Sequence, residues 1–295
     1  MTTPAFPRTL LWQDLTSDEL AAARDAGAMV VVPVGAIEQH AAHLPVETDA
    51  RLATMVTRMA ARRVSALPVI VAPTLPFGFS PHHLSHPGTI SFGLETYLAA
   101  LGDIAKSIAN SGFRRIVLVN GHGGNNAPLR SKVGQLVTDG YPVATVEYWV
   151  PGESRWIPKL LGALKRGGHA CEQETALMMV LADNEAEKRR IAEAAKDMKP
   201  RVIQPWIAPG YAEDPITEAG AAWPPIFQAD DGGYYGDPAA ATAETGEVIL
   251  EIIVERLARF LTGFAAAPLR LGVSRDPARP LISEPLISGT AGASS

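Results

Sequence analysis

The chain of 295 residues has little cysteine, no long apolar run and no basic cluster. Its only cysteine, Cys171, excludes an intrachain disulfide, which fits a reducing compartment without requiring one. No apolar run reaches the length of a bilayer span, so we expect no membrane partner. The first 20 residues lack a basic segment followed by an apolar stretch and a small-residue cleavage site, so we expect a cytoplasmic protein.

Nucleic acid is not an expected partner either. Lys and Arg number 26 against 31 Asp and Glu, for a net charge of -5, and no Lys/Arg cluster is long enough for a nucleic-acid groove. Hydrophobic residues make up 47% of the chain, which excludes a disordered protein and predicts a folded one with a large core.

Val- and Ile-rich runs alternate with helical patterns along the chain. The runs predict strands at residues 29 to 36, 68 to 75, 115 to 121 and 142 to 149. Helices are predicted at residues 16 to 27, 47 to 64, 94 to 112, 125 to 139, 172 to 182 and 239 to 263. Strands that are apolar on both faces and alternate with helices indicate a parallel sheet covered on both sides. We therefore predict one α/β domain over residues 1–265, followed by a Pro-, Gly-, Ala- and Ser-rich arm or disordered tail over residues 266–295.

All seven histidines fall in four short stretches, at residues 40 to 43, 82 to 86, 122 and 169. Three stretches follow predicted strands, and the fourth leads into a helix. Any one histidine alone is more simply explained as a turn or backbone contact. As a set, they indicate a site beyond the carboxyl ends of the strands, where open parallel sheets bind ligands.

The first stretch contributes three candidate ligands. Glu38 and His40, two residues apart in an extended segment, point to the same side. Asp49 falls in the first turn of the next predicted helix, where a carboxylate also has the alternative role of stabilising the helix dipole.

His122 lies in the segment NGHGGNN after the third strand. A Gly-rich turn can also cradle a phosphate, but the spacing matches neither GxGxxG nor GxxxxGK[ST]. We expect the glycines to bring the backbone close to a metal or substrate.

The last stretch, GGHACEQETALMM, contains His169, Cys171, Glu172 and Glu174. The two glutamates are either ligands or acidic residues of a helix's first turn. Since the sequence shows no base beside Cys171, we expect this residue to be a small buried filler and not a nucleophile.

Together these stretches supply enough ligands for two divalent ions that share a carboxylate. The candidates are three carboxylates and two imidazoles, from Glu38, Asp49, Glu172, His40 and His122. Such a set suits Zn or Mn, and two ions would activate water and polarise a carbonyl. The implied reaction is hydrolysis.

Five segments resemble motifs of the creatininase (creatinine amidohydrolase) family. They are VPVGAIEQHAAHLPVETDA, GFSPHHLSHPGTISF, GFRRIVLVNGHGGN, GHACEQETALMM and YYGDPAAATAETGE. The resemblance implies a three-layer α/β/α fold with a mainly parallel sheet, a dinuclear Zn/Mn centre that hydrolyses C–N bonds, and a homohexamer.

By motif, Glu38 and His122 resemble the ligands of one ion, His40 resembles a ligand of the other, and Asp49 resembles the bridging carboxylate. Creatininase proper has a Glu ligand where this chain has Gly124. Relatives with NGHGGN carry HAGE where this chain has HACE, so the resemblance assigns Glu172 to the second ion. It makes His169 a substrate-contacting, proton-handling residue, with Glu172 beside it in the catalytic set and Glu174 orienting its neighbours.

The expected function is hydrolysis of a C–N (amide) bond of a small, cyclic amide by a metal-bridging hydroxide. Ser80, His169 and the backbone of Gly123 and Gly124 are the expected substrate contacts. Creatinine is not the expected substrate, because residues 165 to 168 replace the Trp-Asp that creatininase proper has before the histidine at the position of His169. His82 and His86 also stand where relatives often have Glu and Phe.

Other functions remain open at this stage. A deformylase or a peptidase-type relative would use the same ions. A metal-dependent isomerase or lyase would use the ions without consuming water. A phosphate- or nucleotide-binding module built on NGHGGN is a further alternative, but it would leave the spacing of Glu38, His40 and Asp49 unexplained.

Overall fold

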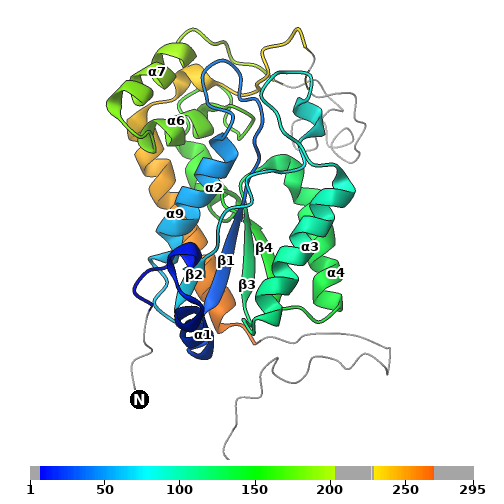
Figure 1. Ribbon diagram of the computed structural model, residues 1–295. Coiled ribbons are helices and arrows are strands. Elements are labelled where there is room, and N and C mark those ends of the chain that lie inside the picture. The colour runs from blue at the N-terminus through cyan, green and yellow to red at the C-terminus, as the bar shows by residue number, and fades with distance from the viewer. Residues whose placement is uncertain (1–6, 203–226, 228, 269–295) are drawn as a thin grey trace, which may run out of the picture.

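A parallel four-stranded sheet forms the centre of the protein. The computed structural model describes residues 7–202, 227 and 229–268. The strands are β1 (Met29–Val34), β2 (Val69–Val71), β3 (Ile116–Asn120) and β4 (Val143–Glu147), in the order β2-β1-β3-β4 (Figure 1). All three strand pairs are parallel, as the two-sided apolar runs predict.

Helices cover both faces of this sheet. The helices are α1 (Ser17–Asp25), α2 (Thr48–Ala61), α3 (Leu94–Asn110), α4 (Asn126–Thr138), α5 (Glu153–Trp156), α6 (Glu172–Val180), α7 (Glu185–Ala195) and α9 (Ala243–Ala266). Helices α2, α6 and α9 pack together on one face, and α3 and α4 pack together on the other (Figure 1). The predicted three-layer α/β/α fold is confirmed.

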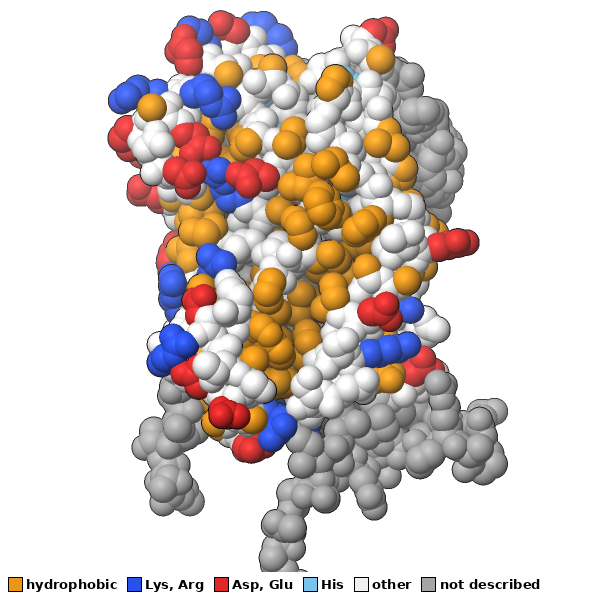
Figure 2. All heavy atoms as spheres, viewed as in Figure 1, with side chains coloured by type: hydrophobic (Ala, Val, Ile, Leu, Met, Phe, Trp, Pro, Cys, Tyr) orange, Lys and Arg blue, Asp and Glu red, His pale blue; other side chains and the backbone are white. Residues whose placement is uncertain are grey.

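Two separate apolar cores follow from the alternation of side chains along each strand. Met29 and Val31 of β1 point into the core shared with α2, α6 and α9. Val30 and Val32 point into the core shared with α3 and α4. Figure 2 shows further apolar side chains gathered along the face between α2 and α3.

Local capping signals set several helix boundaries. Thr16 caps α1 by accepting a hydrogen bond from the backbone N–H of Glu19, whose carboxylate accepts one from the Thr16 N–H. The sequence prediction missed α7, although Asn184 marks its start by accepting hydrogen bonds from the N–H groups of Ala186 and Glu187.

Helix α9 ends at Ala266, and residues 269–295 of the expected tail lie outside the described residues. Among the residues that are described, no helix is both long and apolar enough to cross a bilayer.

Candidate metal centre

Four of the expected ligands meet beyond the carboxyl ends of β1 and β3. Glu38 and His40 lie on the loop after β1, Asp49 lies in the first turn of α2, and His122 follows β3 by two residues. All four side chains are buried. Gly121 lets α2 approach this closely, since a Cβ there would lie 2.7 Å from the backbone oxygen of Asp49.

The two carboxylates and the two imidazoles face one another. Nε2 of His40 lies 3.2 Å from Oδ1 of Asp49. Nδ1 of His122 lies 3.1 Å from Oδ2 of Asp49 and 3.2 Å from Oε1 of Glu38. Asp49 therefore turns one oxygen toward each histidine, as a carboxylate shared by two ions would.

Backbone carbonyls orient three imidazoles of the site. In each, one ring nitrogen lies within hydrogen-bond distance of a carbonyl oxygen: His40 Nδ1 and Glu38 at 3.1 Å, His122 Nε2 and Phe79 at 3.2 Å, and His169 Nε2 and Gln39 at 2.8 Å. A carbonyl only accepts, so that nitrogen carries a proton, and the opposite nitrogen faces the carboxylates, where the neutral ring would offer a lone pair to a cation. Metal-binding histidines are commonly oriented in this way.

Several buried polar atoms at this point have no hydrogen-bond partner within the described structure. They are both carboxylate oxygens of Glu38, Nε2 of His40 and Oδ2 of Asp49. Unpaired buried carboxylates are costly, and a divalent cation would satisfy these oxygens and nitrogens together. Carboxylate and imidazole donors without cysteine suit Zn or Mn, so the residues fit the expected ions.

Neighbouring side chains of the site have strongly shifted pKa values. Burial raises the pKa of Glu38, although nearby His122 opposes the shift. Burial alone would lower the pKa of His40, but the carboxylates of Asp49, Glu174 and Glu38 raise it to about 9. Burial likewise acts to raise the pKa of Asp49, but His40 and His122 hold it well below its usual value. The metal-free cluster thus keeps a proton that a bound cation would displace.

The structure does not bring Glu172 to this cluster. Its carboxylate accepts hydrogen bonds from the backbone N–H groups of Leu161, at 2.5 Å, and Gly162, at 3.0 Å. Glu174 instead offers an oxygen within 4.8 Å of ligand atoms of both His40 and His169. Burial raises the pKa of Glu174 to about 7, against the opposing effect of His40.

The expected substrate contacts lie close to the cluster. Nδ1 of His169 lies 3.5 Å from Oε1 of Glu38. The buried hydroxyl of Ser80 lies 3.1 Å from Nε2 of His122, so it supports that ring directly. Gly123 is exposed, while Gly124 is tightly surrounded: a Cβ there would lie 2.4 Å from Nε2 of His122.

Sequence reasoning assigned no individual role to two residues of the site, Gln39 and His83. His83 is buried, with Nε2 3.2 Å from Oε1 of Glu38. Its place in the segment PHHLSHPGT, after the second strand, was the available signal. Gln39 lies between the expected ligands Glu38 and His40 and contacts His83, but an amide gives no signal of metal chemistry in sequence.

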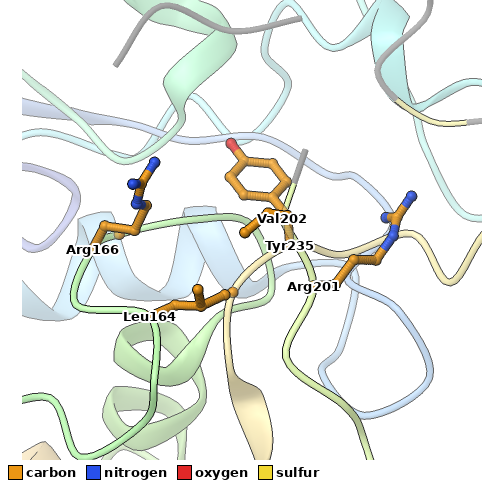
Figure 3. Close-up of a pocket in the computed structure, with 7 residues that line it drawn as sticks. Leu164, Arg166, Arg201, Val202 and Tyr235 are labelled. Carbon is orange, nitrogen blue, oxygen red and sulfur yellow. The ribbon is translucent and has the colours of Figure 1, made fainter. Parts of the chain in front are cut away.

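A small hollow lies beside His169, whose backbone pairs with that of Tyr235. Leu164, Arg166, Arg201, Val202 and Tyr235 line it (Figure 3). The guanidinium groups of Arg166 and Arg201 stand on opposite sides of the Tyr235 ring. Arg166, which lies in the segment where creatininase proper has Trp-Asp, and Arg201 therefore place two cationic side chains at this hollow.

This fold and this set of side chains fit a metal-dependent hydrolase, and the family and relatives that match the chain are hydrolases of C–N bonds. The chain belongs to the creatininase family, because the family described as "Creatininase: Creatinine amidohydrolase" matches residues 13–261.

Curated relatives support this class. The chain is 30% identical to a mycofactocin precursor peptide peptidase of Mycobacterium tuberculosis, over 79% of this chain and 85% of the relative. It is 27% identical to a creatinine amidohydrolase of Pseudomonas putida, over 88% of this chain and 96% of the relative.

Solved structures share the fold. A structure described as "Creatininase Mn" matches with a TM-score of 0.68 and 25% identity, over 88% of this chain and all of that one. A creatininase structure at 24% identity, with a TM-score of 0.71 and the same coverage, shows the fold alone.

Proposed function

We propose that this chain binds two divalent ions, Zn and/or Mn, and uses them to hydrolyse the amide C–N bond of a small cyclic substrate. Glu38 and His122 would hold one ion, His40 and Glu174 would hold the other, and Asp49 would bridge them. The observation that carries this proposal is the backbone-fixed orientation of His40 and His122, which turns one nitrogen of each ring toward buried carboxylates that have no hydrogen-bond partner for some of their oxygens.

Glu174 takes the place in this proposal that the sequence resemblance gave to Glu172. Both carboxylate oxygens of Glu172 already accept backbone hydrogen bonds, whereas Glu174 reaches the histidines. Because Gly124 carries no side chain, it cannot supply the glutamate that creatininase proper has there.

The ions, when bound, would polarise the substrate carbonyl and supply a nucleophile from water at neutral pH. The protein's own groups perform the remaining tasks. Burial of the carboxylates excludes bulk water and strengthens their interactions. His169, with Nδ1 turned toward the cluster, would take up a proton there and pass it to the departing nitrogen. The backbone of Gly123 and Gly124 would contact the substrate.

A peptide amide is the second candidate substrate. The peptidase relative from Mycobacterium tuberculosis matches over most of both chains. Residues 165 to 168 also differ from the Trp-Asp of creatininase proper, and Arg166 lines the hollow beside His169. A deformylase is a third amide-cleaving variant of the same chemistry.

By family resemblance, we also infer a cytoplasmic homo-oligomer, a hexamer. Sedimentation of the purified chain at several concentrations tests the hexamer.

The primary experiment is to measure metal per chain in protein purified without added metal, and then activity on lactams, hydantoins, creatinine, formamides and short peptides, before and after chelation. We expect close to two ions per chain and hydrolysis that is lost on chelation and restored by Zn or Mn. Incorporation of oxygen-18 from labelled water into the product separates hydrolysis from an isomerase or lyase reaction. Failure to take up either metal would contradict the proposal.

A further inference from the structure

Gln39 lies between Glu38 and His40 in the sequence and is only 4% exposed. Its backbone N–H donates a hydrogen bond to Oγ1 of Thr89 at 3.0 Å, which ties it to the loop that follows β2. A buried amide beside a metal site has to satisfy each of its donors and acceptors. The hydrogen-bond partners of the Gln39 amide therefore indicate its role.

Backbone groups fix which way the Gln39 amide points. Oε1 accepts a hydrogen bond from the N–H of Ala41 at 3.0 Å, and Nε2 donates one to the carbonyl of Gly233 at 2.8 Å. The reversed amide would set two donors against each other at Ala41 and two acceptors against each other at Gly233. The amide nitrogen is therefore on the Gly233 side.

The second hydrogen of that nitrogen goes to His83. Nε2 of Gln39 lies 2.9 Å from Nδ1 of His83, and because the amide nitrogen only donates, Nδ1 must accept. The proton of the neutral His83 ring is then on Nε2, which lies 3.2 Å from Oε1 of Glu38. His83 thus turns its N–H side toward a carboxylate of the cluster.

The backbone carbonyl of Gln39 orients a second imidazole, that of His169. The carbonyl of Gln39 accepts from Nε2 of His169 at 2.8 Å, which leaves Nδ1 unprotonated and 3.5 Å from the same Oε1 of Glu38. The amide nitrogen of Gln39 also approaches Nε2 of His169, at 3.2 Å, but both are donors and their hydrogens have other acceptors. Two imidazoles that flank one oxygen of Glu38 therefore present opposite groups to it, an N–H and a lone pair.

We infer that Gln39 is a positioning residue that sets the tautomers of both flanking histidines, His83 through its side-chain amide and His169 through its backbone carbonyl. His83 then presents an N–H to the Glu38 carboxylate, which favours the charged carboxylate at that place, while His169 keeps a bare Nδ1 that can receive a proton during hydrolysis. The effect on catalysis rests on the proposed function, whereas the assignment of the two tautomers rests on the hydrogen bonds alone.

Solid-state nitrogen-15 NMR of histidine-labelled chain, metal-free and zinc-loaded, measures the tautomers directly. We expect the neutral His83 to be protonated at Nε2 and His169 to be protonated at Nε2, with signals assigned by loss in His83→Gln and His169→Gln. In Gln39→Met, which removes the amide but keeps the carbonyl, His83 should shift toward the other tautomer while His169 keeps its own.

His86→Ala is the matched control. His86 holds the loop that contains Gly233 from another side, with Nε2 3.1 Å from the carbonyl of Asp231, and it does not touch Gln39. We expect this variant to leave the tautomer of His83 unchanged. A wild-type His83 protonated at Nδ1, an unchanged His83 in Gln39→Met, or the same shift in His86→Ala would each overturn the inference.

Kinetics test the catalytic consequence. In zinc-loaded Gln39→Met we expect kcat to fall by roughly 10- to 100-fold, as for other residues that orient groups around a metal, with KM changed by less than about twofold. An unchanged kcat would overturn the catalytic role. If the wild-type chain hydrolyses none of the tested amides, the proposed function fails, and the NMR result still decides the role of Gln39.

Discussion

Glu172 and Glu174 lie two residues apart at the start of α6, yet their carboxylates serve different parts of the fold. Glu172 accepts the backbone N–H groups of Leu161 and Gly162 and so fixes the loop before the helix. Glu174 approaches His40 and His169. Residues two apart on a helix do not share a face, so only one of the two can join the cluster.

Exchange of each glutamate for glutamine separates these roles. We expect Glu174→Gln to lose bound metal and to lower hydrolysis by at least about 100-fold while the chain stays folded. We expect Glu172→Gln to keep its metal but to lose roughly 1–3 kcal/mol of unfolding free energy, because one buried N–H loses its acceptor. Metal content and urea denaturation of both variants check this. Metal loss in Glu172→Gln with full metal in Glu174→Gln would restore the assignment made from sequence.

Gly124 and Gly123 form a second matched pair. A Cβ at residue 124 would lie 2.4 Å from Nε2 of His122, 2.5 Å from the carbonyl of Phe79 and 2.6 Å from the His82 ring, whereas a Cβ at residue 123 meets nothing within 4 Å. We expect Gly124→Ala to displace His122 and weaken metal binding by about tenfold or more. Gly123→Ala should keep its metal affinity. Zinc titration with a competing chelator measures both, and equal affinities would contradict the tight packing at residue 124.

The sheet was predictable because parallel strands covered on both faces are apolar throughout, and Val- and Ile-rich runs of this kind precede three of the four groups of histidines. The location of the site followed from the same pattern. Choosing between Glu172 and Glu174 was not possible, because the motif does not show which face of α6 turns toward the strands. Gln39 was missed because its role depends on Gly233, which is 194 residues away along the chain.

Cys171 should be chemically inert in the folded protein. It is buried just before α6, and its Cβ lies 2.6 Å from where a Cβ on Gly236 would be, so the Gly236 segment packs tightly against it. Burial raises the pKa of this thiol, and the nearby Glu174 adds to the shift. We expect iodoacetamide to modify Cys171 only after unfolding, and Cys171→Ala to retain hydrolysis within about threefold, since a buried thiol with a raised pKa is a poor nucleophile. Rapid alkylation of the native protein, followed by mass spectrometry, would show that the site opens.

His43 should make the metal-free protein less stable in mild acid. Its Nε2 bonds to Oγ1 of Thr175 at 2.8 Å, and burial, with His40 and Arg190 nearby, lowers its pKa to about 4 from the usual value of 6.5. As the pH falls from about 6.5 to about 4, the unfolded chain takes up a proton at residue 43 that the folded chain does not. The free energy of unfolding therefore falls over this window, by up to roughly 3 kcal/mol from this group.

The variant His43→Asn removes this titrating group, although it also changes stability at every pH through its lost contact with Thr175. Only the pH dependence of the difference between the two proteins is therefore informative. Urea denaturation between pH 7.5 and pH 4.5 should show a shallower loss of stability in the variant than in the wild type. Parallel curves would mean that His43 is protonated in the folded chain as readily as in the unfolded one, which would contradict its burial as a neutral ring.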